Sequence, residues 1–167
     1  LSGGVALNCV ANGKLIESNI FENIWVQPAS GDAGGALGSA LALWHSEYTP
    51  DVSKNSKDTM KGSYLGPSYS SEEIKAQLDQ IDANYSLLSH ENLINTVAKD
   101  LDKEKIIGWF QGRMEFGPRA LGNRSIIANA KSKDMQKKLN MKIKYRESFR
   151  PFAPSVLREH LSKWFSL

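Results

Sequence analysis

The strongest chemical signal in the sequence is a stretch that concentrates arginines and glycines directly after an apolar run. Residues 112–125 read Gly-Arg-Met-Glu-Phe-Gly-Pro-Arg-Ala-Leu-Gly-Asn-Arg-Ser, and the cations among them are Arg113, Arg119 and Arg124. Glycine lets the backbone turn sharply and bring its N–H groups close to a ligand. Arginine offers a planar fork of donors that matches the oxygens of a phosphate. The stretch therefore predicts a site for a phosphate-bearing anion.

A second basic cluster follows about 20 residues later and carries the same chemistry. Residues 144–154 read Lys-Tyr-Arg-Glu-Ser-Phe-Arg-Pro-Phe-Ala-Pro, and we expect Arg146 and Arg150 to face one ligand. The alternative is structural, because Glu115 and Glu147 can pair with these cations at the surface. Composition alone favours neither interpretation.

A glycine turn near the start of the chain is typical of an anion-binding helix N-terminus. Residues 2–8 read Ser-Gly-Gly-Val-Ala-Leu-Asn, so free backbone N–H groups and the positive end of a helix dipole are expected at Gly3 and Gly4. The alternative is a Gly-Gly turn that only reverses the chain.

Asp32, in the sequence Gly31-Asp32-Ala33-Gly34-Gly35, allows two interpretations. An aspartate at the start of a helix is most often an N-cap, whose side chain accepts a backbone N–H. As a hard oxygen ligand it also suits a metal ion. The three histidines are too scattered along the sequence to form an obvious site with it.

Charge is divided unevenly along the chain. Residues 1–104 hold seven lysines and no arginine against fourteen acidic residues, whereas residues 105–150 hold twelve lysines and arginines against three acidic residues. The resulting net charges are −7 and +9. Such a split favours an anionic partner for the second half, either a small phosphate compound or a nucleic acid backbone, with a solvated basic face as the structural alternative.

Composition excludes several classes of protein. The chain has 167 residues, of which 41% are hydrophobic and 23% charged, and this is the composition of a globular protein. It contains no apolar run long enough to cross a bilayer, so we expect a soluble, cytoplasmic protein without a membrane partner. The single cysteine, Cys9, excludes an intramolecular disulfide and is expected in the core together with the tryptophans.

Alternating helical and apolar segments predict an α/β fold with a mixed sheet. Helices are expected at 5–13, at 33–48, at 71–81 with an N-cap at Ser71, from Ser89 to 101, at 133–143, and at the end of the chain to 165. Strands are expected at 20–26, 106–110, 125–128 and 153–157. The second of these is expected to be buried. Residues 49–71 are polar, lack an amphipathic period and are predicted to be a linker.

Four motifs in a fixed order resemble the NodU/CmcH family of O-carbamoyltransferases. They are the glycine turn at 2–8, Gly-Asp-Ala-Gly-Gly-Ala at 31–36, Phe-Gly-Pro-Arg-Ala-Leu-Gly-Asn-Arg-Ser at 116–125, and Arg-Glu-Ser-Phe-Arg-Pro-Phe-Ala-Pro at 146–154. The short Tyr-Leu-Gly-Pro at 64–67 is also similar to the family. The resemblance covers almost the entire chain.

The resemblance implies an actin-like, metal-dependent ATPase-type domain joined to a twisted α/β domain of the YrdC-like type. Residues 1–48 are expected to be the last segment of the actin-like domain, 49–71 the linker, and 72–167 part of the YrdC-like domain. In such enzymes the YrdC-like part activates carbamoyl phosphate with ATP as carbamoyl adenylate. The actin-like part then passes the carbamoyl group to a hydroxyl of a sugar, an antibiotic or a lipid.

The resemblance also assigns roles to individual residues. Gly3, Gly4 and Asn8 match the nucleotide-contacting turn, and Asp32 matches an aspartate that binds a divalent metal, expected to be iron in the intact enzyme. Carbamoyl phosphate and the ATP phosphates are expected to bind the basic residues Arg119, Arg124, Lys144, Arg146 and Arg150.

The family's histidine metal ligands have no counterpart in this chain, so we expect the chain by itself to be inactive and to require the rest of a parent chain. The alternative function is a basic nucleic-acid-binding module of the YrdC-like type. Against it, Phe116, Phe149 and Phe152 lie beside prolines and are expected to pack inside the protein rather than to stack on bases.

Overall fold

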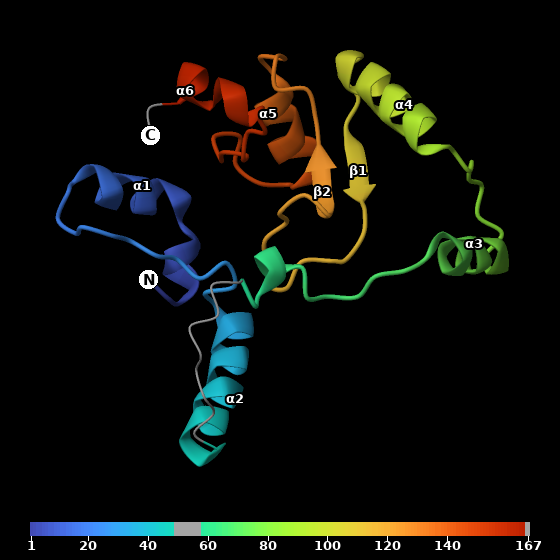
Figure 1. Cartoon of the computed structure of the whole chain (residues 1–167). Helices are drawn as coiled ribbons and strands as arrows, with labels where there is room; N and C mark the ends of the chain where they lie inside the picture. Colours follow the sequence, from blue (N-terminus) through green and yellow to red (C-terminus); the bar gives the residue numbers. More distant parts are fainter. Residues whose placement is uncertain (49–57, 166–167) are drawn as a thin grey trace. The chain divides into compact units, whose positions relative to one another are not determined.

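Figure 1 shows the chain as a computed structural model that describes residues 1–48 and 58–165. Its α-helices are α1 (Cys9–Glu17), α2 (Asp32–Tyr48), α3 (Ser71–Gln80), α4 (His90–Asp102), α5 (Met135–Lys138) and α6 (Leu161–Trp164). Short 3-10 turns form η1 (Gly4–Leu7), η2 (Lys61–Ser63) and η4 (Arg158–His160), and η3 (Leu139–Ile143) is a π-helical turn. In the described part of the chain, no helix combines the length and apolarity that crossing a bilayer requires.

The chain divides into two compact units, and each consists of two separate segments. The first unit contains Leu1–Tyr85 and Trp109–Ser125, and the second contains Ser86–Gly108 and Ile126–Leu167. Of the predicted linker, residues 49–57 lie outside the described residues. The division places the first basic cluster with the glycine turns of the first unit, and the second basic cluster in the second unit.

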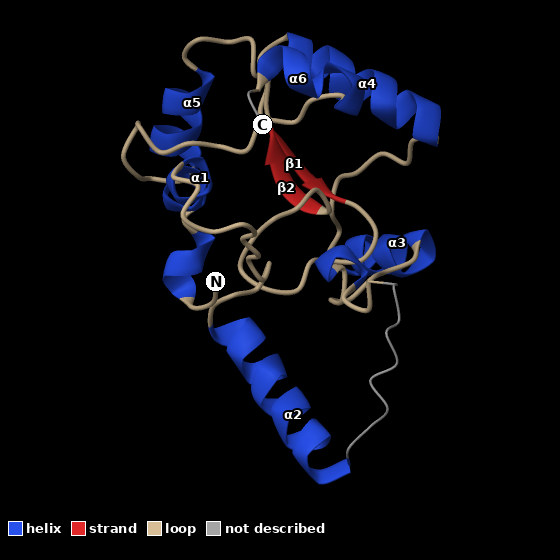
Figure 2. Cartoon of the chain, turned by 60° about the vertical axis from the view of Figure 1, so that its left-hand side comes forward, coloured by secondary structure: helices blue, strands red, loops and turns tan. Residues whose placement is uncertain are grey.

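Two short strands, β1 (Ile107–Phe110) and β2 (Arg124–Ile127), pair as an antiparallel sheet (Figure 2). Helices together with this small sheet are consistent with the predicted α/β class. The prediction of a buried strand at 106–110 was wrong about burial, because half-buried and exposed residues alternate along β1.

Two further predicted strands, at 20–26 and 153–157, are not strands in the structure. A strand is stable when a neighbour completes its hydrogen bonds and covers one face. In the first segment Phe21 is 58% exposed and Trp25 is 69% exposed, so the apolar pattern has no surface to pack against. In the second, Pro151 and Pro154 have no N–H to donate to a neighbouring strand.

Local capping explains where the helices begin. Ser70, rather than the predicted Ser71, caps α3, because its hydroxyl accepts the N–H of Glu73 while the Glu73 carboxylate accepts the N–H of Ser70. This reciprocal pair requires a glutamate three residues after the cap. Ser89 caps α4 as predicted. The predicted helix at 133–143 is α5 followed by η3.

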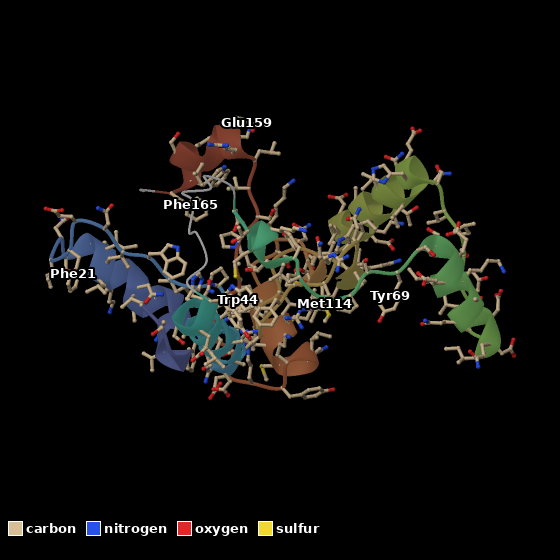
Figure 3. All side chains as sticks on the ribbon, turned by 60° about the horizontal axis from the view of Figure 1, so that its bottom comes forward. Phe21, Trp44, Tyr69, Met114, Glu159 and Phe165 are labelled. Carbon is tan, nitrogen blue, oxygen red and sulfur yellow. The ribbon has the colours of Figure 1, made fainter. Side chains whose placement is uncertain are left out.

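Buried apolar side chains are small and few among the described residues. They are Ala6 and Ala29 in the first unit and Met135 and Leu139 in the second. The prediction that Cys9 and the tryptophans lie in the core was wrong for Cys9, Trp25, Trp44 and Trp164, which are exposed. Phe21, Trp44 and Tyr69, labelled in Figure 3, are each at least half exposed.

Candidate functional site

In the first unit, hydrogen bonds bring together three motifs that are far apart in the sequence. The N–H of Gly3 donates to the carbonyl of Ser30 at 2.6 Å, which ties the first glycine turn to the second. Arg119 of the basic loop donates from Nη2 to the carbonyl of Leu7 at 3.0 Å. This bond joins residues 112 positions apart in the sequence, although neither Arg119 nor Leu7 lines the pocket described below.

Close packing supports the same arrangement. A Cβ on Gly117, whose φ is +97°, would lie 2.7 Å from the Cβ of Ala29. A Cβ on Gly34 would lie 2.0 Å from the carbonyl oxygen of Ala29. Ala29 is fully buried, and any side chain larger than that of glycine at position 34 or 117 would collide with it. Glycine at both positions therefore lets the basic loop pack against the turn before α2.

An open pocket of about 340 Å³ lies between the two glycine turns. Residues 2–4 and 30–35 provide most of its lining, including Gly3, Gly4 and Asp32. Ser30 is 6% exposed, and its hydroxyl has no hydrogen-bond partner among the described residues. The predicted free N–H at Gly3 was wrong, because that N–H donates to the carbonyl of Ser30. The groups of the pocket that suit the oxygens of a phosphate are therefore the N-terminus of α2 and the unpartnered hydroxyl of Ser30.

Of the two other residues predicted for this site, Asp32 lines the pocket and Asn8 does not. Asn8 does not line the pocket; it caps α1 by accepting the N–H of Ala11. Asp32 does line the pocket and is the first residue of α2, so it is not the N-cap that was one interpretation of the sequence. Among the residues that the structure describes, no group of three or more His, Cys, Asp or Glu side chains could hold a metal ion.

A buried carboxylate organises the first basic loop. Glu115 is 1% exposed and accepts N–H bonds from Leu121 and Asn123, each at 2.7 Å, and from Arg124 at 3.1 Å. Burial by itself raises the pKa of Glu115, but these backbone N–H groups lower it more, and the pKa lies below its usual value. The carboxylate is therefore an internal anchor for the loop and not a surface partner of its arginines.

The arginines of this loop are not equivalent. Arg124 is half-buried, forms an ion pair with Glu115 at 3.5 Å and donates to the carbonyl of Gly117, so its donors hold the loop. Arg113 donates to the carbonyl of Gly66 at 2.7 Å. Arg119 is exposed and uses one Nη for Leu7. Of the three, Arg119 combines exposure with a fixed position beside the glycine turns.

The Tyr-Leu-Gly-Pro motif supports this loop from its other side. Gly66 donates to the carbonyl of Met114, and the N–H of Met114 donates to the carbonyl of Pro67. The Tyr64 hydroxyl donates to the carbonyl of Leu121 at 3.0 Å. The sequence motif was recognised without a role, and the Gly66-Pro67 pair, which is typical of a turn, was the available signal. Its role is to hold the backbone from which Arg119 extends.

The second basic cluster is held by residues that sequence reasoning missed. Arg146 donates from Nε to the Oδ1 of Asn140 at 2.6 Å, and Arg150 donates from Nε to Glu147 at 2.8 Å. The pair between Arg150 and Glu147 is exposed, as the structural interpretation of the sequence predicted. The guanidinium of Arg146 lies 5.0 Å from the centre of the Phe152 ring. An uncharged amide among lysines and apolar residues was the sequence signal for Asn140.

Aromatic side chains beside these cations are more exposed than predicted. Phe149 is 74% exposed and Tyr145 is 86% exposed, whereas Phe116 and Phe152 are half-buried. The prediction that Phe149 packs inside the protein was wrong, because no apolar neighbour within the described residues covers it. Exposed rings alternate here with Lys144, Arg146 and Arg150.

Comparison with family models matches both ends of the chain. Residues 1–41 match the model described as the carbamoyltransferase N-terminus. Residues 98–167 match the model described as the carbamoyltransferase C-terminus. The three converging motifs of the first unit are therefore drawn from both family regions.

Relatives resemble the chain along its whole length. An uncharacterized protein of Synechocystis is 54% identical over 169 residues and includes 100% of this chain. The nodulation protein NolO of Bradyrhizobium diazoefficiens is 43% identical over 100% of the chain, and the 3'-hydroxymethylcephem-O-carbamoyltransferase of Streptomyces clavuligerus is 34% identical over 99%. The chain spans 28%, 30% and 29% of these three relatives.

Proposed function

The chain belongs to the NodU/CmcH family of carbamoyltransferases, and we propose that it supplies the phosphate-binding part of an enzyme that carbamoylates a hydroxyl group. In the proposed reaction, water first releases inorganic phosphate from carbamoyl phosphate and leaves carbamate. The carbamate oxygen then attacks the α-phosphorus of ATP, so that carbamoyl adenylate forms and pyrophosphate leaves. The acceptor oxygen then takes the carbamoyl group and AMP leaves. Proposed acceptors are a sugar, an antibiotic or a lipid, and the name of the Streptomyces relative identifies a hydroxymethyl cephem for that protein.

The observation that carries this proposal is the bond between Arg119 and Leu7, which ties an exposed cation to the segment that follows Gly3 and Gly4, two residues that line the pocket. An exposed guanidinium lowers the energy of a phosphate-bearing ligand and of the charge that develops during transfer. In the proposal, Gly3 and Gly4 line the space for the phosphates of ATP, and the hydroxyl of Ser30 and the N-terminus of α2 donate to them. Arg119, in the first unit, binds the phosphates of ATP in this proposal, and the cluster of Lys144, Arg146 and Arg150, in the second unit, binds carbamoyl phosphate.

Two predicted roles are revised in the proposal. Arg124 acts as a positioning residue, because its donors serve Glu115 and Gly117. Asp32 offers a single carboxylate, which does not make a metal site by itself. No step is therefore assigned to a metal, and further ligands are proposed to come from the rest of a parent chain. The actin-like and YrdC-like domains, and a cytoplasmic location suited to ATP, are also proposals.

The test is isothermal titration calorimetry of the chain with ATP and, separately, with carbamoyl phosphate. We expect saturable binding of both ligands. Arg119→Ala should weaken ATP binding and Arg150→Ala should weaken carbamoyl phosphate binding, each about tenfold or more, because each variant removes a charge-assisted donor. Arg158→Ala is the matched control, because Arg158 is an exposed arginine outside both clusters. Absence of binding, or an equal loss in the control, contradicts the proposal.

A nucleic-acid-binding module is the second candidate function, and the exposed Tyr145 and Phe149 favour it. Rings that alternate with cations suit the stacking of single-stranded bases. Titration with a short single-stranded RNA at two salt concentrations distinguishes the candidates. Steeply salt-dependent RNA binding without heat from carbamoyl phosphate supports the module.

A further inference from the structure

Asn140 is a fully buried amide in the second unit, with 0% of its surface exposed. Its Nδ2 donates to the carbonyls of Ser148 at 3.0 Å and Arg150 at 2.8 Å. Its Oδ1 accepts the Nε–H of Arg146 at 2.6 Å, and its backbone carbonyl accepts the N–H of Arg146 at 3.0 Å. Both N–H donors of the side-chain amide, its oxygen and the backbone carbonyl of Asn140 therefore all bond to the loop that carries the second basic cluster.

The turn that contains Asn140 explains how the side chain reaches this position. Asn140 lies in η3, where the N–H of Lys144 donates to the carbonyl of Leu139, five residues earlier. Such π-helical turns are uncommon and frequently mark functional sites. Leu139 is also buried, so the turn is anchored on the apolar side of α5 and η3.

The contact through Nε leaves the outer part of the Arg146 guanidinium for another partner. Arg146 is half-buried and lies over the Phe152 ring, and within the described residues its Nη groups make no hydrogen bond. A guanidinium has five N–H donors in a rigid fork, four of them on the Nη groups. With Nε held, the orientation of those four donors is set by Asn140.

We propose that Asn140 is a positioning residue that orients the guanidinium of Arg146 for binding a phosphate-bearing anion. The identity of that anion as carbamoyl phosphate rests on the function proposed above. Fixing a fork of donors before the anion arrives avoids the entropic cost of ordering it on binding. The contacts of Asn140 to the carbonyls of Ser148 and Arg150 stabilise the loop, which is a structural role. The contact to the Nε of Arg146 is the one that orients the cation.

Gln136 provides a matched control. Its Nε2 donates to the carbonyls of Phe149 and Arg150, each at 3.1 Å, so it supports the same loop from α5. Gln136 is exposed and makes no hydrogen bond with Arg146. Removing its amide tests loop support without removing the contact that orients the guanidinium.

The experiment measures dissociation constants for inorganic phosphate and for carbamoyl phosphate by calorimetry. We expect Asn140→Leu and Arg146→Lys each to weaken phosphate binding about tenfold, because both abolish the held fork while the second keeps the charge. In Arg146→Ala, adding Asn140→Leu should cause no further loss, since Asn140 acts through Arg146. Gln136→Ala should change the constant by less than about twofold.

Arg146→Lys keeps the proposal testable if Asn140→Leu does not fold, because residue 146 is partly exposed and its charge remains. Equal phosphate affinity in Arg146→Lys and the unchanged chain overturns the proposal, as does additivity of the two substitutions or the absence of phosphate binding. If phosphate binds with the expected pattern but carbamoyl phosphate binds no more tightly, Asn140 keeps its role and the proposed function fails.

Discussion

Glu115→Gln should destabilise the first unit while leaving its shape almost unchanged. Glu115 is 1% exposed, accepts three backbone N–H groups and pairs with Arg124, which itself is half-buried. Glutamine retains one oxygen for Leu121 and Asn123. Its amide group replaces the oxygen that faces the N–H and Nε of Arg124, so donors then face donors.

The magnitude follows from those contacts. Removing one partner of a buried, hydrogen-bonded charge pair costs about 3 kcal/mol, because the remaining charge is left without compensation. The free energy of unfolding, measured by urea denaturation with fluorescence detection, should fall by about that amount. The four tryptophans of the chain include Trp109, which begins the second segment of the first unit and reports on it.

Dependence on pH provides a second measurement of the same contact. The pKa of Glu115 is lower in the folded chain than its usual value of 4.5, so the folded state binds this proton less readily than the unfolded state. The stabilisation is therefore fully present above the unfolded pKa and is lost as the pH falls through the folded pKa. We expect Glu115→Gln to flatten the stability curve in the range below 4.5.

Glu147→Gln is the control, because Glu147 is exposed and its pair with Arg150 lies in the second unit. It should leave the urea midpoint unchanged. A loss of less than about 1 kcal/mol in Glu115→Gln, or an unchanged pH curve, would refute the assignment of Glu115 as the anchor of the loop.

Two further substitutions, and a second measurement on Glu147→Gln, test other parts of the structure. Gly66→Ala places a Cβ 2.8 Å from the carbonyl oxygen of Met114, and thermal denaturation should show a loss of about 1–3 kcal/mol, with an unchanged melting curve contradicting the contact. Glu147→Gln frees the guanidinium of Arg150 and should tighten phosphate binding by about threefold in calorimetry; weaker binding would refute competition between the carboxylate and the anion. Ser30→Ala removes an unpartnered buried hydroxyl, so the melting temperature should not fall while ATP affinity drops about tenfold; unchanged ATP affinity would exclude the hydroxyl from the pocket's ligand contacts.

Elements with strong local signals were predictable from the sequence. Apolar spacing predicts the helices α2, α3 and α4, and serine caps mark the starts of α3 and α4. The predicted cap of α3 differed by one residue because Glu73 pairs with Ser70. The strands β1 and β2 are close to the predicted ranges. Local chemistry decides these elements, since a cap or a helical face involves residues within one or two turns.

Segments at 20–26 and 153–157 were predicted wrongly because an apolar run does not specify its partner. Strand formation requires a neighbouring backbone, and that neighbour is a property of the tertiary structure. Exposure of Trp25, Phe149 and Cys9 has the same origin, because an apolar residue is buried only where another surface covers it. The sequence specifies that a residue is apolar, but it does not specify which part of the folded chain covers that residue.

The sequence by itself determined that the chain concentrates phosphate-binding chemistry in two clusters and two glycine turns. Residue type sets charge, donor number and backbone freedom, and these do not depend on the fold. Tertiary structure decided which of these groups remain available to bind an anion. Arg124 forms an ion pair with the buried Glu115, the exposed Arg119 donates to the carbonyl of Leu7, and Arg146 donates to Asn140 through Nε alone. Hydrogen-bond donors have fixed numbers and directions, so the role of each arginine depends on partners that only folding brings within reach.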